Sequence, residues 1–172
     1  MLFSDHETGN EIAMPRRSIL SALELKLSPV MTAIALAALM WMLARNTPGF
    51  SLAPELRVTA LIVLFAAGAA IGFAGISSFR RARTTVNPWR PHASSALVVS
   101  GVYRRTRNPM YLGLLLALAG WGLYLANPYS LLLALAFVPY MNRFQIRPEE
   151  RALEQTYGDE FIDYCRQVRR WF

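Results

Sequence analysis

Long apolar runs alternate with polar and basic segments along the chain. The runs cover residues 27–44, 56–79, 110–127 and 129–141. A helix needs roughly 20 apolar residues to cross a bilayer, and the first three runs are close to this length or exceed it. The fourth is shorter, so we expect its helix to be tilted or to end below the membrane surface. The pattern predicts an all-α integral membrane protein with about four transmembrane helices.

The charged segment from Arg147 onward predicts a further helix. Pro148 suits a first helical turn, and Glu149 and Glu150 follow it, where acidic side chains interact favourably with the helix dipole. Apolar side chains then recur every three or four residues, with an interruption at Gly158, and they are Leu153, Tyr157, Phe161, Tyr164 and Val168. This spacing predicts a C-terminal amphipathic cytoplasmic helix.

The positions of lysine and arginine predict the orientation in the membrane. Nearly all of them lie in the N-terminal arm, in residues 80–108 and in the C-terminal tail, whereas residues 45–55 hold one and residues 126–129 hold none. Basic segments tend to stay on the cytoplasmic side of a membrane. Four spans therefore place both termini in the cytoplasm.

The same pattern divides the chain into three units. We expect a cytoplasmic arm at residues 1–26, a transmembrane hairpin at 27–79 and a third unit at 80–172. The arm contains acidic residues and has no apolar stretch followed by a cleavage site, so we expect no removable signal peptide. The first apolar run is then an uncleaved span.

Composition narrows the classes of function. The chain has 172 residues, a hydrophobic fraction of 54% and a net charge of +7. Because its arginines flank apolar runs, membrane lipids explain them better than nucleic acid does. Cys165 is the single cysteine, and His6 and His92 lie far apart in sequence. These counts exclude an internal disulfide and argue against a metal site.

Small residues recur in the second apolar run. Gly68, Gly72 and Gly75 fall near one face of the expected helix. Small residues at this spacing let two helix backbones approach closely, which is the interpretation we favour. The alternative is a close-fitting wall for a flat ligand.

Two polar clusters are candidates for a functional site. In the first, Asn108-Pro109 can cap and begin the third apolar helix, and Tyr103, Asn108 and Tyr111 would surround a ligand at the membrane face. The alternative is a helix cap with interfacial aromatic and arginine side chains. In the second, adjacent glutamates follow a transmembrane run at 147–151, where carboxylates tend to face a partner or a polar cavity.

Together, these clusters resemble a known family. The stretch SGVYRRTRNPMYLG, followed by a helical hairpin and then by RPEERALEQTYGDEFIDY, is similar to the isoprenylcysteine carboxyl methyltransferase family. The wider group includes phospholipid N-methyltransferases. The resemblance covers residues 84–172 and is strongest to small bacterial members. It implies a bacterial inner-membrane enzyme whose methyltransferase core is the third unit.

The resemblance also implies a cofactor and a set of site residues. The implied cofactor is S-adenosyl-L-methionine, bound without a Rossmann domain, in keeping with the absence of a GxGxxG motif. Its pocket would be formed by Leu97, Val98, Tyr103, Asn108, Pro109, Met110 and Tyr111, with Glu149 and Glu150 holding the ammonium group. The catalytic candidates, for contact with the substrate carboxylate, are Arg147 and Arg143. Asn108 stands where eukaryotic members often have histidine.

The chemistry of methyl transfer favours one acceptor over another. A carboxylate, with a pKa of about 3.5, is already ionised at neutral pH and needs no general base. An amine, with a pKa of about 10, must first lose a proton. This chemistry favours a carboxylate acceptor, and the resemblance implies that the carboxylate belongs to an isoprenylcysteine-like molecule that enters from the bilayer. The alternatives are phospholipid amine N-methylation and a non-catalytic membrane protein that keeps the fold, and the oligomeric state is not predicted.

Overall fold

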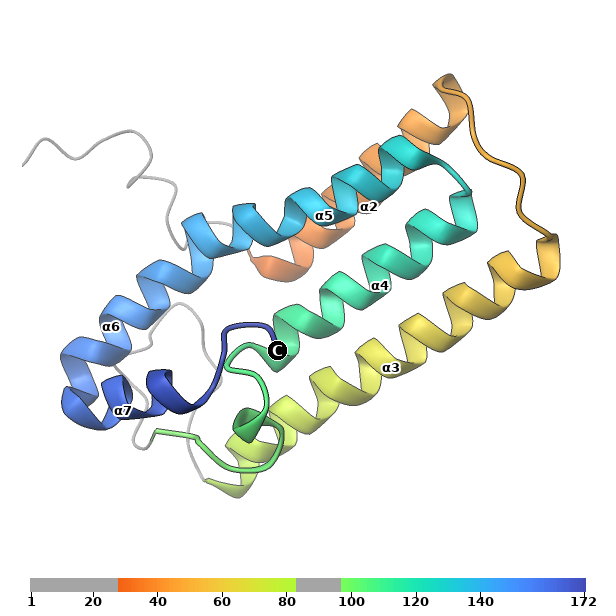
Figure 1. Cartoon of the computed structure of the whole chain (residues 1–172). Coiled ribbons are helices and arrows are strands. Elements are labelled where there is room, and N and C mark those ends of the chain that lie inside the picture. Colours follow the sequence, from red (N-terminus) through yellow and green to blue (C-terminus); the bar gives the residue numbers. More distant parts are fainter. Residues whose placement is uncertain (1–27, 83–96) are drawn as a thin grey trace, which may run out of the picture.

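The computed structural model describes residues 28–82 and 97–172. Every regular element in these two ranges is helical. In chain order the elements are α2 (Pro29–Asn46), α3 (Pro54–Arg81), η2 (Gly101–Arg104), α4 (Pro109–Leu125), α5 (Pro128–Met141), η3 (Asn142–Ile146), α6 (Arg147–Tyr157) and α7 (Asp159–Gln167) (Figure 1). The predicted arm at 1–26 and the loop residues 83–96 lie outside the described residues.

Helix α4 is the centre of the bundle. It packs against α3 on one side and against α2 and α5 on the other, as Figure 1 shows. Each of these four helices begins with a proline: Pro29, Pro54, Pro109 and Pro128. Proline is well tolerated at this position because a first-turn N–H would have no helical acceptor. The four helices follow the four apolar runs, with ends that differ by a few residues.

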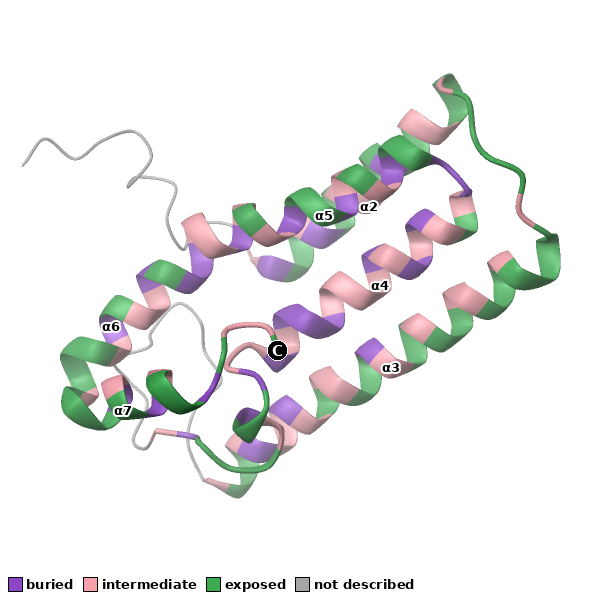
Figure 2. Ribbon diagram, in the orientation of Figure 1, coloured by how far each residue is buried: buried purple, intermediate pink, exposed green. Residues whose placement is uncertain are grey.

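The outward faces of α2 and α3 are apolar and exposed (Figure 2). Both helices are long and apolar enough to cross a membrane, whereas α4 is a shorter apolar helix and α5 has 14 residues. Exposed large side chains on the two long helices include Met31, Ile34, Met42, Ile62, Phe65 and Phe73. Apolar surface of this extent suits contact with lipid chains. The helices therefore indicate a membrane protein.

Helix α5 continues into α6 without a turn. The link is the π-helical segment η3, in which the Arg147 N–H donates to the carbonyl of Asn142, five residues back. Pro148 follows directly, and it has no N–H to donate to the carbonyl four residues before it. The prediction that Pro148 begins a separate helix was therefore incomplete, because the chain stays helical from α5 through Tyr157.

The predicted C-terminal helix is two helices. Gly158 separates α6 from α7 and adopts φ 54° and ψ −127°, a conformation that side chains with a Cβ rarely tolerate. The turn lets the two helices fold onto the segment that begins at Leu97. The predicted apolar positions then form one cluster with Leu97, and the cluster contains Leu153, Tyr157, Phe161, Tyr164 and Val168.

The glycines of α3 bring its backbone against α4. A Cβ built on Gly68 would lie 2.5 Å from the carbonyl oxygen of Gly113, and one on Gly75 would lie 3.1 Å from Pro109 Cγ. A Cβ on Gly72 meets nothing within 4 Å. The packing interpretation is therefore confirmed for Gly68 and Gly75. The contact fixes the start of α4, and with it Tyr111, relative to α3.

Gly68→Ala should destabilise the protein, because the added methyl group meets backbone atoms that cannot rotate away. We expect a loss of about 1–3 kcal/mol from overpacking, seen as a lower thermal unfolding temperature in detergent. Gly72→Ala on the same helix is the control, since its methyl group enters open space. Equal unfolding temperatures for the two variants would show that the close α3–α4 contact does not exist.

Candidate functional site

A partly buried carboxylate, that of Glu149, joins the start of α4 to the start of α6. The hydroxyl of Tyr111 donates to Glu149 Oε1 at 2.5 Å, and Gln145 Nε2 donates to the same oxygen at 2.8 Å. Tyr111 is 6% exposed. The two predicted clusters, separated in sequence by a helical hairpin, are thus in direct contact.

The environment of Glu149 makes it difficult to ionise. Its pKa is raised to about 7, mainly because burial disfavours the charged form; the hydrogen bonds from Tyr111 and Gln145 oppose this shift, and the neighbouring Glu150 adds to it. Within the part of the chain that the structure describes, no cation is among the groups that shift this pKa. Glu149 is therefore a carboxylate held in place by two neutral donors, and its negative charge is available to a cationic ligand.

Glu150, the next residue, is paired within the protein. Arg170 donates to it through Nε at 2.9 Å and through a terminal nitrogen at 2.6 Å. Arg107 forms a further ion pair with it at 3.1 Å. The side chains of Arg107 and Glu150 are 13% and 17% exposed. Two guanidinium groups thus neutralise Glu150, so of these two adjacent glutamates Glu149 is the one without a cationic partner among the described residues.

The C-terminal tail closes over the loop that precedes α4. The side chains of Thr106 and Asn108 donate to the Arg170 carbonyl at 3.1 Å and 3.0 Å, and the Arg107 N–H donates to the carbonyl of Arg169. Trp171 Nε1 donates to Asn142 Oδ1 on η3 at 3.1 Å. The tail therefore connects the loop before α4 to the η3 segment between α5 and α6, as its position in Figure 1 shows.

Asn108 has a different local role from the predicted one. It is the N-cap residue of α4, but its side chain makes no capping hydrogen bond, because its amide is directed to the tail. Its carbonyl accepts from Leu112 and begins the helix. Its assignment to cofactor binding remains a prediction.

Tyr103 lies on η2 beside the buried carboxylate. It is 6% exposed, its ring meets Phe79 edge-on at 5.4 Å, and its carbonyl accepts from the Tyr164 hydroxyl at 2.8 Å. Burial, followed by the nearby Tyr164 and Glu149, raises the pKa of its phenol well above the usual value. The Tyr103 side chain therefore stays protonated at neutral pH.

The other predicted cofactor residues surround the same end of α4. Pro109 is fully buried, and Met110 packs on the bundle core. Val98 is 6% exposed, and Leu97 packs on the cluster formed by α6 and α7. The structure thus gathers all the predicted pocket residues around one end of the bundle.

The two catalytic candidates lie one turn apart. Arg143 is on η3, and its guanidinium lies 5.4 Å from the centroid of the Phe144 ring. Arg147 begins α6 and is exposed. Neither distance nor burial identifies which of the two arginines would contact the substrate carboxylate. The substrate role of each remains a prediction.

Several residues of the site were missed from the sequence. Gln145 lies four residues before Glu149, a spacing that places two side chains on one helical face, so this partner could have been found. The partners of Glu150, Arg107 and Arg170, are remote in sequence, and no local pattern marks them. Tyr164 was expected only as an apolar position of an amphipathic helix.

The arrangement suits an amino-acid-like ligand better than a metal ion. The described residues contain no group of three or more potential metal-ligating side chains. Glu149 can accept hydrogen bonds from an ammonium group. The first N–H groups of α4, at Met110 and Tyr111, have no acceptor within the helix and favour an anion such as a carboxylate.

Comparisons with known proteins identify relatives of this chain. A family model described as phospholipid methyltransferase matches residues 56–160. An uncharacterized protein of Haemophilus influenzae is 47% identical over 62 residues, which are 36% of this chain and 98% of that protein. Protein-S-isoprenylcysteine O-methyltransferase B of Arabidopsis thaliana is 37% identical over 75 residues, 42% of this chain and 36% of that enzyme.

The yeast relative shows the same pattern of partial coverage. The protein-S-isoprenylcysteine O-methyltransferase of Saccharomyces cerevisiae is 33% identical over 79 residues, 46% of this chain and 33% of the enzyme. The aligned part of the chain thus spans only about a third of the length of the plant and yeast enzymes.

The raised pKa of Glu149 predicts a pH-dependent cost to stability. Its pKa is about 7 in the folded protein against 4.5 for an ordinary glutamate, so the folded state binds the proton more tightly. Stability should therefore fall as the pH rises from about 4.5 to about 7. The unfolding temperature of the Glu149→Gln variant should therefore vary less between about pH 5 and pH 8 than that of the unchanged protein.

Glu154→Gln, at an exposed position of α6, is the matched control for this measurement and should behave like the unchanged protein. An identical pH dependence for Glu149→Gln and Glu154→Gln would show that Glu149 titrates normally.

Proposed function

Because this chain belongs to the phospholipid methyltransferase family, we propose that it transfers a methyl group from S-adenosyl-L-methionine to a lipophilic acceptor. The acceptor class we propose is the carboxylate of an isoprenylcysteine-like molecule, which becomes a methyl ester. The named plant and yeast relatives support this choice. The observation that carries the proposal is the Glu149 carboxylate, which is partly buried, oriented by Tyr111 and Gln145, and not paired with a cation in the described residues.

The residues around Glu149 fit the charged groups of this cofactor. Glu149 would hold the ammonium group, and the N–H groups of Met110 and Tyr111 would face the carboxylate. The cofactor supplies a methyl group bonded to a positively charged sulfur. Glu150 is a weaker candidate than the sequence suggested, because Arg107 and Arg170 already neutralise it.

The titratable groups of the site favour a carboxylate acceptor. Transfer to an ionised carboxylate moves one methyl group to oxygen and releases no proton, so no base is required. Tyr103 has a raised pKa and is a poor proton acceptor. Glu149 has a pKa of about 7 and could accept a proton from an amine, but only if it did not hold the ammonium group. This last possibility keeps phospholipid amine methylation as the second candidate.

The remaining contribution of the chain is to position the reactants and exclude water. Displacement at a methyl group requires donor and acceptor in line, and burial strengthens the electrostatic contacts that hold them. The C-terminal tail, bonded to Thr106, Asn108 and Asn142, is the element that would close the site. Arg143 or Arg147 would neutralise the acceptor carboxylate.

The proposed topology has four spans, α2 to α5, with both termini and the site in the cytoplasm. The support is that the basic residues of the described chain cluster at the end of the bundle that carries Tyr111 and Glu149, as the positive-inside rule requires. Residues 80–172 would form the methyltransferase core, and residues 27–79 a hairpin that supports it. A C-terminal reporter active only outside the cytoplasm would disprove this orientation.

Glu149→Gln should weaken binding of S-adenosyl-L-methionine by about tenfold or more, since a hydrogen bond to a charged group contributes about 1.5–3 kcal/mol. Isothermal titration in detergent measures this, with Glu154→Gln as the control. Because a proton competes with the ammonium group for Glu149, affinity for the unchanged protein should also fall between about pH 7.5 and pH 6. No binding at millimolar cofactor would refute the methyltransferase proposal.

A transfer assay with radiolabelled methyl groups should identify the acceptor class. We expect base-labile label on a farnesylcysteine analogue and none on phosphatidylethanolamine, because an ester hydrolyses in base and a methylated amine does not. Arg143→Gln or Arg147→Gln should lower turnover more than cofactor affinity. Base-stable label on phosphatidylethanolamine would instead favour the amine methyltransferase.

A further inference from the structure

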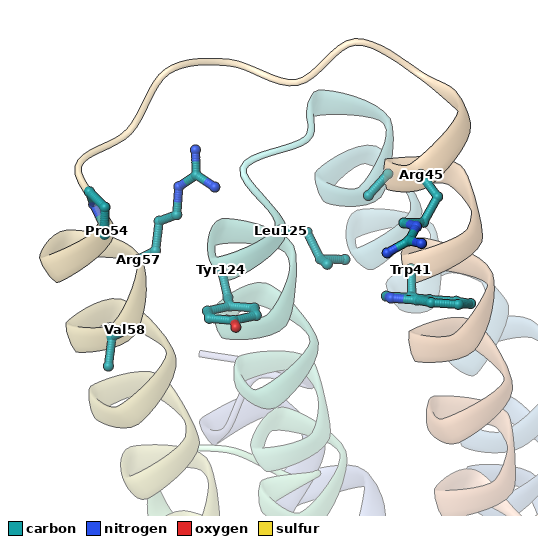
Figure 3. Close-up of a pocket in the computed structure, with 8 residues that line it drawn as sticks. Trp41, Arg45, Pro54, Arg57, Val58, Tyr124 and Leu125 are labelled. Carbon is teal, nitrogen blue, oxygen red and sulfur yellow. The ribbon is translucent and has the colours of Figure 1, made fainter.

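A groove of about 440 Å³ opens at the end of the bundle that is remote from Tyr111 and Glu149. It is lined by the last turns of α2 and α4 and the first turn of α3 (Figure 3). Since Tyr111 is in the first turn of α4 and Tyr124 in the last, the helix separates the two sites by roughly 20 Å at 1.5 Å per residue. The groove is therefore separate from the proposed methyl-transfer site at Tyr111 and Glu149.

Two arginines stand on opposite walls of this groove. Arg45 comes from α2 and Arg57 from α3, with Tyr124 of α4 between them in Figure 3. They are the only lysine or arginine residues between positions 27 and 79, and the only acidic residue in that range is Glu55. Glu55 forms no ion pair with either arginine in the described part of the chain. The groove thus carries a positive charge in an otherwise apolar region.

Both guanidinium groups are fixed by contacts that leave donors for a ligand. Arg57 Nε donates to the Leu52 carbonyl at 3.0 Å. This bond holds the side chain in place and leaves its two terminal nitrogens to donate to a ligand. Arg45 lies over the ring of Trp41, 5.3 Å from its centroid. Guanidinium groups held in this way are suited to bind the oxygens of a phosphate.

The rest of the groove is apolar and faces the region expected to hold lipid. Val58 and Leu125 line it, and Trp41 and Tyr124 are 48% and 39% exposed. Exposed tryptophan and tyrosine beside charged groups are typical of the level of lipid head groups. Free phosphate would use only the arginines, whereas a lipid would also cover these apolar side chains. We propose that the groove binds the head group of an anionic phospholipid.

Native mass spectrometry of the detergent-solubilised chain tests this proposal with dioleoylphosphatidylglycerol as the probe. The test variant carries Arg45→Gln and Arg57→Gln. The control carries Arg80→Gln and Arg81→Gln, which remove the same charge from exposed positions at the other end of α3. Dioleoylphosphatidylcholine and glycerol 1-phosphate serve as competitors. Thermal unfolding of each variant shows that it is folded.

We expect the unchanged protein and the control to bind phosphatidylglycerol in preference to phosphatidylcholine. The test variant should bind it about thirtyfold more weakly, since each of the two basic residues near anionic lipid contributes about 1 kcal/mol and the neighbouring apolar contacts remain. A third variant with Arg45→Lys and Arg57→Lys should retain part of the affinity. If it unfolds like the unchanged protein, it also separates lost charge from lost structure.

Three results would overturn the proposal. Equal weakening in the test and control variants would mean that net charge alone attracts the lipid. Unchanged binding in the test variant would exclude the groove. Displacement of the lipid by an equal concentration of glycerol 1-phosphate would identify a site for free phosphate esters. Titration with S-adenosyl-L-methionine does not depend on any of these three lipid-binding results. Failure of the lipid proposal can therefore be distinguished from failure of the methyltransferase proposal.

Discussion

The ion pairs of Glu150 hold together the three segments that form the candidate site. Arg107 belongs to the loop before α4, Glu150 to the first turn of α6, and Arg170 to the tail. Because Arg107 and Glu150 are largely buried, loss of one partner would leave a charge without compensation, which typically costs about 3–5 kcal/mol. Every other contact of the site, including the closure by the tail, requires these segments to be in place.

Adjacent glutamates acquire different roles because they are on a helix. Consecutive side chains on an α-helix point about 100° apart, so Glu149 and Glu150 cannot both face one ligand. Glu150 points to the loop and the tail, where two arginines neutralise it. Glu149 points to Tyr111 and Gln145, which donate hydrogen bonds without adding charge. The sequence motif of two acids therefore contains one residue that forms structural ion pairs and one candidate binding group.

The sequence predicted what depends on local pattern and missed what depends on remote contacts. The apolar runs located α2 to α5 to within a few residues, because the length and hydrophobicity of a run are sufficient to predict an apolar helix. The approach of Tyr111 to Glu149 followed from the resemblance. The π-helical link, the second helix that follows the predicted interruption at Gly158 and the bonds of Asn108 to the tail were not predicted. The bonds of Asn108 to the tail join residues 62 positions apart, and no periodicity records them. The π-helical link and the turn at Gly158 use carbonyls five and four residues back, and the spacing of apolar side chains does not record where the hydrogen-bond pattern of a helix changes.

The central helix connects two polar ends and keeps them energetically separate. Residues 109–125 contain no charged side chain, and the backbone contact of Gly113 with Gly68 fixes α4 against α3 near the start of α4. Coupling between distant sites requires an element with two alternative arrangements that both sites bias. A helix held by backbone-to-backbone packing offers no such alternative within its own length. Binding at the groove of Arg45 and Arg57 should therefore contribute to anchoring in lipid and leave the affinity at Glu149 unchanged, as expected for separated sites with no shared partner.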